Sequence, residues 1–493
     1  MRHRVTGVPD IVEIASDIVG SENVLTGPAI PLDYSHDECL TVGPAAPVAV
    51  VLPADTEEVS ALLRAANERL IPVTARGGGT GMSGACTPDR EGIVISFERM
   101  NRILEIDVEN HVAVVEPGVT LEQLDAETSK HGLVYPVFPG ENTATLGGNV
   151  ATNAGGMRAV KYGVTRNQVL GLEAVLASGE IIRTGGKVVK SSSGYDLTQL
   201  LVGSEGTLAL VTEVTVKLHP RLPHRATVLA PFATLDQVTS AVPRVVASGI
   251  GPMILEYIDL LTMAATTEAV GLDLGIGAEI KQQALAYLVV QLESTHEDRL
   301  EQDVAAVGEL LDELGAIEVF VLPPTAAEQL ILARERAFFV AKAHGANDIV
   351  DVVVPRASIS QFLSTVADLA PRHGAMVAGC GHAGDGNVHL SVFQPDNYER
   401  DRLIRELFQA GLDLGGVISG EHGLGRAKQH WFLEMEDPVK IGLLRRIKVA
   451  FDPNGILGPG VGPGPDLRDG AGTEQIPTEQ PLPTKQNIAG VSR

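Results

Sequence analysis

The chain has 493 residues, of which 44% are hydrophobic and 20% are charged, and its formal net charge is −24. This length predicts more than one domain and allows large hydrophobic cores. The acidic balance argues against nucleic acid as a partner and against a polybasic membrane anchor, because both require clustered lysine and arginine. A local basic pocket can still bind an anionic substrate.

Cysteine content and the ends of the sequence narrow the class of protein further. Cys39, Cys86 and Cys380 are the only cysteines, and none forms a CxxC pair. The sequence therefore encodes no iron–sulfur cluster or thiolate zinc site, and no disulfide framework is expected. There is no apolar signal region and no run of about 18 apolar residues. We expect a cytoplasmic protein without a transmembrane helix, with peripheral membrane association left open.

The first recognisable unit follows a lead-in over residues 1–46. An apolar strand over 47–52, a helix capped by Asp55 and a strand over 71–75 predict a βαβ unit that ends in a glycine turn. Residues 136–163 have the Gly, Asn, Thr and Ala composition of a long binding loop. Further strands are predicted over 93–96, 103–107, 112–115, 171–177, 181–183 and 208–218, with a helix over 121–131.

The sequence changes character near residues 220–223, where we place a domain boundary. Residues 223–457 alternate strands with long helices, an α+β pattern. Glycine, proline and polar residues dominate over 458–493, which we expect to be a disordered tail. The domains are thus expected over 47–222 and 223–457. Within the second, the predicted elements include a strand over 287–292 and helices over 297–314 and 401–414.

A glycine-rich loop, residues 76–84, follows the strand of the βαβ unit directly and holds five glycines. Glycine backbone allows positive φ and close approach to a ligand, and successive N–H groups can form an anion-binding nest. A pyrophosphate is the natural occupant, and a mobile surface turn is the alternative. The loop is not the GxGxxG fingerprint of dinucleotide-binding folds, because no helix pattern follows it.

A second small-residue run, residues 139–156, is almost free of charge, so few side chains compete with its backbone for a ligand. A flexible linker is the alternative, although linkers seldom interleave Leu, Val and Ala so regularly with glycine. Two further small-residue turns occur at residues 162–163 and 203–207.

A histidine cluster is the most specific feature of the second half. His382 and His389 flank a Gly-Asp-Gly turn, with His382 expected at a strand end and His389 on the next strand. Glu421 and His422 follow in another glycine-rich turn. Two imidazoles and a carboxylate form a common zinc or iron set. The alternative is that the histidines are structural and hydrogen-bond the glycine turn.

These motifs, in this order over residues 47–219, resemble the FAD domain of the vanillyl-alcohol-oxidase (p-cresol methylhydroxylase) family. The resemblance implies an α+β fold: a two-part FAD-binding domain followed by an α+β substrate (cap) domain with an antiparallel sheet. It also implies noncovalent FAD, because no histidine occurs between Arg76 and Ile93, where covalent members often carry one. The implied FAD contacts are Arg76, Gly77, Gly78, Gly79, Thr80, Gly81, Met82, Ser83, Pro139, Gly140, Thr145, Gly147, Gly148, Asn149, Thr152, Asn153, Gly155, Gly156, Tyr162, Glu205, Gly206 and Val211.

Residues 231–460 resemble the 2-hydroxyacid dehydrogenase branch, which includes D-lactate dehydrogenases, the glycolate oxidase D subunit and D-2-hydroxyglutarate dehydrogenase. The resemblance implies a divalent metal, for which we expect zinc, on His382, His389 and Glu421. It assigns His422 as the catalytic base and Arg334 as the residue that binds the substrate carboxylate. A planar guanidinium is well suited to this contact. Lys428 matches a third catalytic position, with a purely structural role as the equal alternative.

The sequence differs from the family pattern near its C-terminus. Gly458 and Val461 replace the usual asparagine and lysine, which puts any ligand contact from those side chains in doubt. Residues 348–355 offer no Lys or Asn placed to bind a second carboxylate, which favours a small monocarboxylate over 2-hydroxyglutarate.

The expected reaction is oxidation of a D-2-hydroxy acid, such as D-lactate or glycolate, with hydride passing to flavin N5. A non-redox transferase of the alkyl-dihydroxyacetone-phosphate synthase type and an FAD subunit of a larger electron-transfer complex are the alternatives. The electron acceptor stays open between oxygen, a quinone and a partner protein, and a homodimer is left open.

Overall fold

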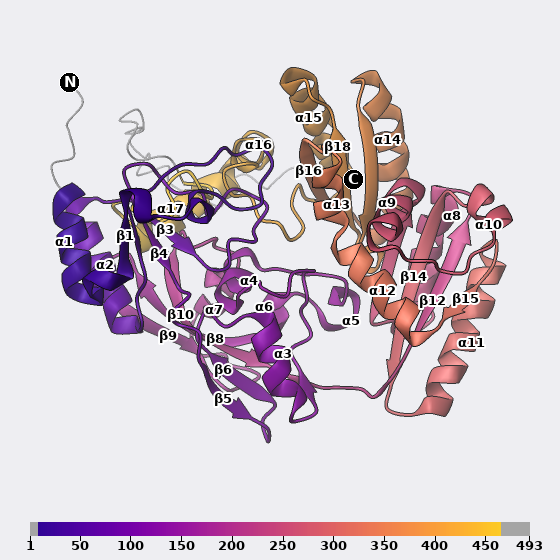
Figure 1. Ribbon diagram of the computed structural model, residues 1–493, viewed down its shortest axis with the longest axis horizontal. Coiled ribbons are helices and arrows are strands. Elements are labelled where there is room, and N and C mark those ends of the chain that lie inside the picture. Colours follow the sequence, from indigo (N-terminus) through magenta and orange to yellow (C-terminus); the bar gives the residue numbers. More distant parts are fainter. Residues whose placement is uncertain (1–7, 465–493) are drawn as a thin grey trace, which may run out of the picture.

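The computed structural model describes residues 8–464 and shows two halves side by side (Figure 1). The predicted tail falls mostly on residues 465–493, outside the described residues. Its predicted start is wrong, because residues 458–464 are packed against the protein. The Gly458 N–H donates to the carbonyl of Val73 over 2.9 Å, and Val461 is buried.

The first sheet holds the βαβ unit that the sequence predicted. Its strand order is β1-β2-β4-β3, with β1 antiparallel to β2 and the other pairs parallel. Asp55 caps the connecting helix α2, since its carboxylate accepts from Glu58 N over 2.9 Å. The expected lead-in is part of this unit: it supplies β1 and the packed helix α1. The elements are α1 (Val8–Val19), β1 (Val24–Thr26), β2 (Ala49–Val51), α2 (Thr56–Arg69), β3 (Val73–Arg76) and β4 (Ile93–Ser96).

The second sheet of this half is antiparallel, with strand order β5-β6-β10-β8-β9. Its strands are β5 (Ile103–Asp107), β6 (Val112–Val115), β8 (Val169–Leu176), β9 (Ile181–Gly185) and β10 (Ala209–Lys217). The helices between them are α3 (Leu121–Ser129), α4 (Leu146–Thr152), α5 (Ala159–Tyr162), α6 (Thr165–Gln168) and α7 (Leu197–Leu201), and β7 (Leu133–Val134) pairs with β11 (His219–Pro220).

Helix α4 lies within the run that the sequence predicted as one long loop. Thr145 caps it by accepting from Gly148 N over 3.3 Å, and Leu146 and Val150 are fully buried. Burial of these two side chains stabilises a helical turn despite the glycines, whose helix propensity is low.

The second half is built on one antiparallel sheet with strand order β15-β12-β14-β13-β17-β18-β16. The strands are β12 (His224–Phe232), β13 (Ile254–Asp259), β14 (Ala286–Ser294), β15 (Phe320–Leu322), β16 (Asp348–Val353), β17 (Met376–Gly381) and β18 (Asn387–Phe393). Alternate residues of each strand face opposite sides, as the strand repeat requires.

Helices cover the two faces of this sheet differently. Helices α8 (Leu235–Ala247), α11 (Glu297–Glu313), α14 (Ile359–Arg372) and α15 (Asn397–Asp413) bury one face along its whole width. Helices α9 (Leu260–Val270), α12 (Pro324–Glu335) and α13 (Ala337–Ala343) pack on the other face, mainly over β12, β13 and β14. That second face carries His389 and Asp351, because the neighbouring residues Val388, Leu390, Val350 and Val352 belong to the first face.

The C-terminal segment returns to the first half (Figure 1, yellow). It contains α16 (Gln429–Met435) and α17 (Pro438–Phe451), while α10 (Ala278–Gln283) lies beside the large sheet. Lys448 anchors the segment by donating from Nζ to the carbonyls of Thr207 and Leu457 over 2.7 and 2.9 Å. Between residues 8 and 464, no helix is long and apolar enough to cross a membrane.

Candidate active site

The glycine-rich loop after β3 lines a cleft in the first half, which we call the glycine cleft. Gly79 has a φ of 72°, a left-handed conformation that residues with a Cβ rarely adopt. The cleft has a volume of about 170 Å³ and is also lined by the second small-residue run. Both runs therefore meet at one cavity. The predicted FAD contacts that line it are Arg76, Gly77, Gly78, Gly79, Thr80, Gly81, Met82, Ser83, Pro139, Thr145, Gly147, Gly148, Asn149, Thr152, Gly155, Glu205, Gly206 and Val211.

The walls of the glycine cleft fit a polar cofactor. Asn149 lines the cleft, and its Nδ2 is buried without a hydrogen-bond acceptor among the described residues. A ligand oxygen can satisfy this donor, which would otherwise carry an uncompensated desolvation cost. Gly77 leaves no room for a side chain, because a Cβ there would lie 2.4 Å from Thr145 Oγ1. Bare backbone therefore faces the cofactor position.

Four predicted FAD contacts do not line this cleft. Gly140 lines a second cavity instead. Asn153 ends α4 in a left-handed conformation and does not line the cleft, whereas Gly155 lines it two residues later. Gly156 and Tyr162 do not line it either, and the Tyr162 hydroxyl hydrogen-bonds Glu293 of the other half.

The lead-in contributes to the cleft in a way that the sequence did not reveal. Asp37 lines the cleft, and its carboxylate accepts from Cys39 N over 3.1 Å. Arg76 holds this segment in place by donating from Nη1 to the carbonyl of His36 over 2.8 Å. No pattern around Asp37 marked it as a site residue. Part of the role of Arg76 is thus to bind another segment of the same protein.

The histidine cluster converges in the second half as the sequence predicted. His382 follows β17, His389 lies on β18, and the short 3-10 turn η5 (Ala383–Asp385) joins them. Nε2 of His382 lies 2.9 Å from Glu421 Oε1, and Nε2 of His389 lies 3.2 Å from the same oxygen. Ligand atoms of the three residues all lie within 4.8 Å of one another, so they can hold one ion.

A carboxylate that the sequence analysis missed stands behind His382. Glu256 of β13 is fully buried, and its Oε1 lies 2.6 Å from His382 Nδ1. Burial disfavours the charged imidazole, but Glu256 and Glu421 outweigh it and raise the pKa of His382 to about 10. The site between these groups thus attracts positive charge, as a proton or as a metal ion. A carboxylate on the far nitrogen of a histidine ligand is the usual arrangement at metal sites.

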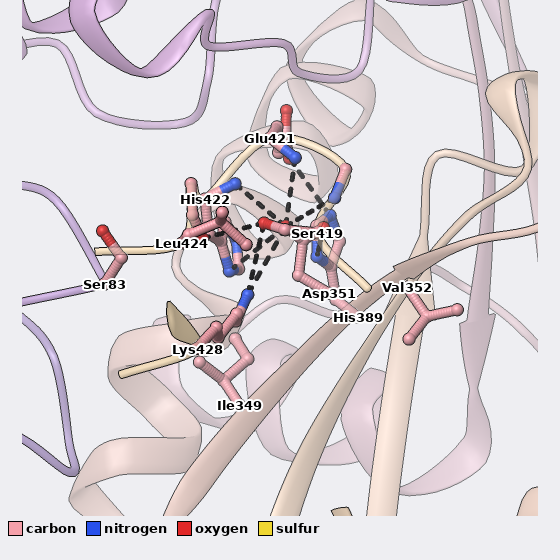
Figure 2. A network of polar contacts seen from close by, with 12 residues as sticks. Ser83, Ile349, Asp351, Val352, His389, Ser419, Glu421, His422, Leu424 and Lys428 are labelled. Atoms are coloured by element: carbon pink, nitrogen blue, oxygen red, sulfur yellow. Dashed lines mark hydrogen bonds and ion pairs between the residues drawn. The ribbon is translucent and has the colours of Figure 1, made fainter. Parts of the chain in front are cut away.

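Asp351 is the second missed carboxylate and organises the turn that carries Glu421 and His422 (Figure 2). Its Oδ2 accepts from four donors: Ser419 Oγ, Gly420 N, Glu421 N and His422 N, at 2.9–3.0 Å. Burial would raise the pKa of Asp351, but His422 and Lys428 hold it well below its ordinary value. The turn is therefore fixed by a buried, ionised carboxylate.

Asp351, His389 and His422 form a second set of potential metal ligands. Oδ2 of Asp351 is already occupied by four donors, and this residue lines neither cavity. The set of His382, His389 and Glu421 has free access to open space and matches the residues predicted from the sequence. It is therefore the better candidate for a metal.

The second cavity, here called the histidine cavity, has a volume of about 360 Å³. One end of it is formed by Arg334, His382, His389, Glu421 and His422. Glu421 and His422 also line the glycine cleft, so the two cavities adjoin at these side chains.

Arg334 lies at the polar end of the histidine cavity and has an N–H donor available for a ligand. It lies in the last turn of α12, and its Nη2 is 2.8 Å from Glu256 Oε2. Its Nε is buried and finds no acceptor among the residues that the structure describes. An anionic ligand in the cavity can satisfy this donor.

His422 and Lys428 occupy different positions relative to the cavity. The His422 ring stacks on that of His389 with centroids 5.1 Å apart, and its Nδ1 lies 3.9 Å from Asp351 Oδ2. Burial lowers the pKa of His422 to about 4, so the ring is neutral near pH 7. Lys428 lies behind Asp351, with Nζ 3.7 Å from Oδ2, and lines neither cavity. Its position suits support of Asp351 rather than contact with a ligand.

Glu205 connects the first half to the turn that carries His422. Its carboxylate accepts from Gly425 N over 2.9 Å and Leu424 N over 3.3 Å, and it lies 3.4 Å from Ser83 Oγ. Burial raises its pKa to about 7. Gly155 is a second residue of the first half that contacts this turn, because a Cβ at this position would lie 2.5 Å from Glu421 Oε2. The glycine cleft and the metal-ligand turn are therefore in direct contact.

Comparison with known proteins agrees with this geometry. Residues 47–185 match the model of the FAD binding domain, and residues 221–461 match that of the C-terminal domain of FAD linked oxidases. The fold is similar to that of p-cresol methylhydroxylase, with a TM-score of 0.76 and 21% identity, over 94% of this protein and 98% of that one.

Three relatives align over most of their length. The chain is 59% identical to an uncharacterised FAD-linked oxidoreductase of Mycobacterium tuberculosis, over 90% of its own length and 97% of the relative. It is 41% identical to a D-lactate dehydrogenase of Archaeoglobus fulgidus (83% and 90%) and 37% identical to the glycolate oxidase subunit GlcD of Bacillus subtilis (92% and 96%). The chain therefore belongs to the FAD-linked oxidoreductases of the D-lactate dehydrogenase and glycolate oxidase branch.

Proposed function

We propose that this protein oxidises a 2-hydroxy acid, of the D form where C2 is chiral, to the 2-oxo acid with noncovalent FAD. D-lactate and glycolate are the simplest candidates. In this proposal residues 47–222 bind FAD in the glycine cleft, and residues 223–457 bind the substrate in the histidine cavity. The observation that carries it is the convergence of an arginine, a metal-ligand set and a neutral histidine in the histidine cavity, where Glu421 and His422 also line the glycine cleft.

Arg334 orients the substrate carboxylate. Its guanidinium is held by Glu256 over 2.8 Å, which fixes the plane of the donors. The buried Nε is free to donate to a carboxylate oxygen. A planar guanidinium can bind both oxygens at once, which an ammonium group cannot do with the same geometry. The carboxylate thereby points C2 toward the junction of the two cavities.

His382, His389 and Glu421 would hold a divalent metal, with zinc the expected ion for this donor set. When bound there, such a metal supplies a Lewis acid that lowers the pKa of the substrate hydroxyl. FAD, when bound in the glycine cleft, supplies the acceptor for the two electrons and the α-hydrogen of the substrate. Glu256 and Asp351 keep the ligating side chains in place from behind.

His422 takes the hydroxyl proton in this proposal. Its Nδ1 lies on the side of Asp351, 3.9 Å from Oδ2, and we assign proton transfer to Nε2. The ring is buried and stacked on His389, so its orientation is fixed before the substrate enters. A positioned general base contributes about 10²–10⁴-fold to the rate.

The test is anaerobic reduction of the bound flavin by D-lactate in the wild type and in His422→Ala. The variant is expected to retain FAD and metal but to lose flavin reduction by about 10²–10⁴-fold. His430→Ala is the matched control, because this histidine lines neither cavity. Reduction of the His422→Ala flavin at the wild-type rate would contradict the role of the base. Reduction of the wild-type flavin without a lipid co-substrate would exclude a transferase of the synthase type.

A further inference from the structure

The histidine cavity extends far beyond the groups that handle a 2-hydroxy carboxylate. Its volume of about 360 Å³ equals roughly twelve water molecules at about 30 Å³ each. Glycolate and lactate carry at most a methyl group beyond the hydroxyl-bearing carbon. Such substrates occupy only the polar end, and the rest of the cavity has no role in their recognition.

The wall of this extension is a ladder of side chains on the sheet. Two cross-strand pairs, Ala378 with Ser391 and Met376 with Phe393, follow His389 along β17 and β18 on the same face. Because each strand residue advances by about 3.3 Å, Phe393 lies about 13 Å along the strand from His389. The cavity therefore leads directly away from the metal-ligand set.

The opposite side of the extension is also apolar. Phe338 and Ala341 of α13 and Leu261 of α9 line it, together with Phe138 and Met157 from the first half. A surface of this composition gains free energy by removing apolar area of a ligand from water. Side chains of both halves thus build a slot for an apolar group.

Charged groups are distributed unevenly in the histidine cavity. Among the described residues that line it, Arg334 is the only arginine or lysine, and it stands at the polar end. The acidic lining residues are Glu335 and Glu421, and His344 lines the extension with its Nδ1 2.8 Å from the carbonyl oxygen of Val340. A second carboxylate on the substrate would therefore meet no arginine or lysine in the extension. Burial without a charged partner is costly for a carboxylate.

We propose that the preferred substrate is a 2-hydroxy acid with an extended apolar side chain, aliphatic or aromatic, rather than glycolate, lactate or a 2-hydroxy diacid. This inference rests on the proposed function, because the polar end is assigned there. The carboxylate and hydroxyl stay at Arg334 and the metal-ligand set. The side chain runs along the ladder toward Met376 and Phe393.

Steady-state oxidation by the metal-loaded holoenzyme with an artificial dye as acceptor tests the proposal. The substrate series is glycolate, D-lactate and the unbranched D-2-hydroxy acids up to D-2-hydroxyoctanoate. We expect kcat/KM to rise by about four-fold for each added methylene group, the factor that corresponds to burial of one such group. D-2-Hydroxyglutarate and D-2-hydroxypentanoate, which have the same number of carbon atoms, form a matched pair, and the diacid is expected to be at least ten-fold poorer.

A variant at the far end gives a second readout. Met376→Glu places a charge at the far end of the ladder, toward which a long side chain extends, and Met376 is half exposed, so the change is compatible with folding. It is expected to lower the ratio of kcat/KM for D-2-hydroxyoctanoate to that for D-lactate by at least ten-fold. Leu332→Glu puts the same charge at a similarly exposed position of α12 outside the cavity and is expected to leave this ratio unchanged.

The outcomes separate the two proposals. If no 2-hydroxy acid reduces the flavin, the proposed function itself fails. If D-lactate or glycolate is oxidised with a kcat/KM equal to or above that of the longer acids, only the preference for an apolar side chain is overturned. A diacid that matches D-2-hydroxypentanoate would also overturn it.

Discussion

Replacement of Asp351 by asparagine removes the charge that fixes the metal-ligand turn. Oδ2 of Asp351 accepts four hydrogen bonds, three of them from the backbone of residues 420–422. A hydrogen bond to a charged group contributes about 1.5–3 kcal/mol, and a neutral one about 1 kcal/mol. Loss of the charge at four bonds therefore costs about 2–8 kcal/mol, a range that includes the 3–5 kcal/mol found when a buried ion pair loses one partner.

Two assays measure this effect. Urea unfolding of the holoenzyme is expected to show a loss of about 2–8 kcal/mol in the free energy of unfolding. Zinc affinity, measured by competition with a chelator, is expected to fall by about 10–100-fold, as it does when supporting groups of a metal site are removed. FAD binding is expected to persist, because Asp351 does not line the glycine cleft.

Asp348→Asn is the matched control for this variant. Asp348 lies three residues earlier on the same strand, where its carboxylate accepts from Ile349 N over 2.8 Å and lies 3.9 Å from Arg400 Nε. Neither partner belongs to the turn of residues 419–422, so its replacement is expected to leave zinc affinity unchanged. If Asp351→Asn loses under about 1 kcal/mol and binds zinc like the wild type, Asp351 does not organise the turn.

Four further outcomes are expected. Chelation of the metal abolishes flavin reduction, and added zinc restores it in the wild type but not in Glu421→Gln, as metal analysis and stopped-flow absorbance will show. Gly155→Ala loses metal affinity, because its Cβ would lie 2.5 Å from Glu421 Oε2. Arg334→Lys raises KM for every 2-hydroxy acid by about ten-fold or more, since an ammonium group cannot bind both carboxylate oxygens in one plane. Burial raises the pKa of Glu205 to about 7, so the folded state binds the extra proton and stability falls as pH rises from 4.5 to 7. The difference between wild type and Glu205→Gln, measured by urea unfolding, is expected to change by about 3 kcal/mol across this window.

Much of the fold follows from local patterns in the sequence. Short apolar runs predicted the strands that became β4, β5 and β6 with the same bounds. Asp55 marked the start of α2 because a side-chain cap acts within one helical turn. Such signals depend only on residues that are close in sequence, so they can be recognised without knowledge of the tertiary structure.

The elements that the sequence analysis missed depend on distant contacts. Helix α4 forms where two buried side chains, Leu146 and Val150, outweigh the low helix propensity of neighbouring glycines. Residues 458–464 look like a disordered tail but pack against β3, since Gly458 N donates to Val73 O. No local sequence pattern indicates the distant contacts on which these two segments depend.

The residues of the active site fall into the same two groups, those that a local sequence pattern marks and those that it does not. His382, His389, Glu421 and His422 stand in glycine-rich turns that the sequence marks clearly. Their supports, Glu256 and Asp351, lie inside apolar strands and are fully buried. A lone carboxylate within an apolar strand carries a burial cost unless it is paired, and that anomaly was the available signal.

Anaerobic titration of the metal-loaded, FAD-bound protein with a D-2-hydroxy acid shows whether such an acid reduces the flavin. We expect complete bleaching of the flavin by one equivalent of substrate, with one equivalent of the 2-oxo acid formed. A flavin that stays oxidised in the presence of every 2-hydroxy acid in the series, in protein with intact FAD and metal content, would contradict the proposed function.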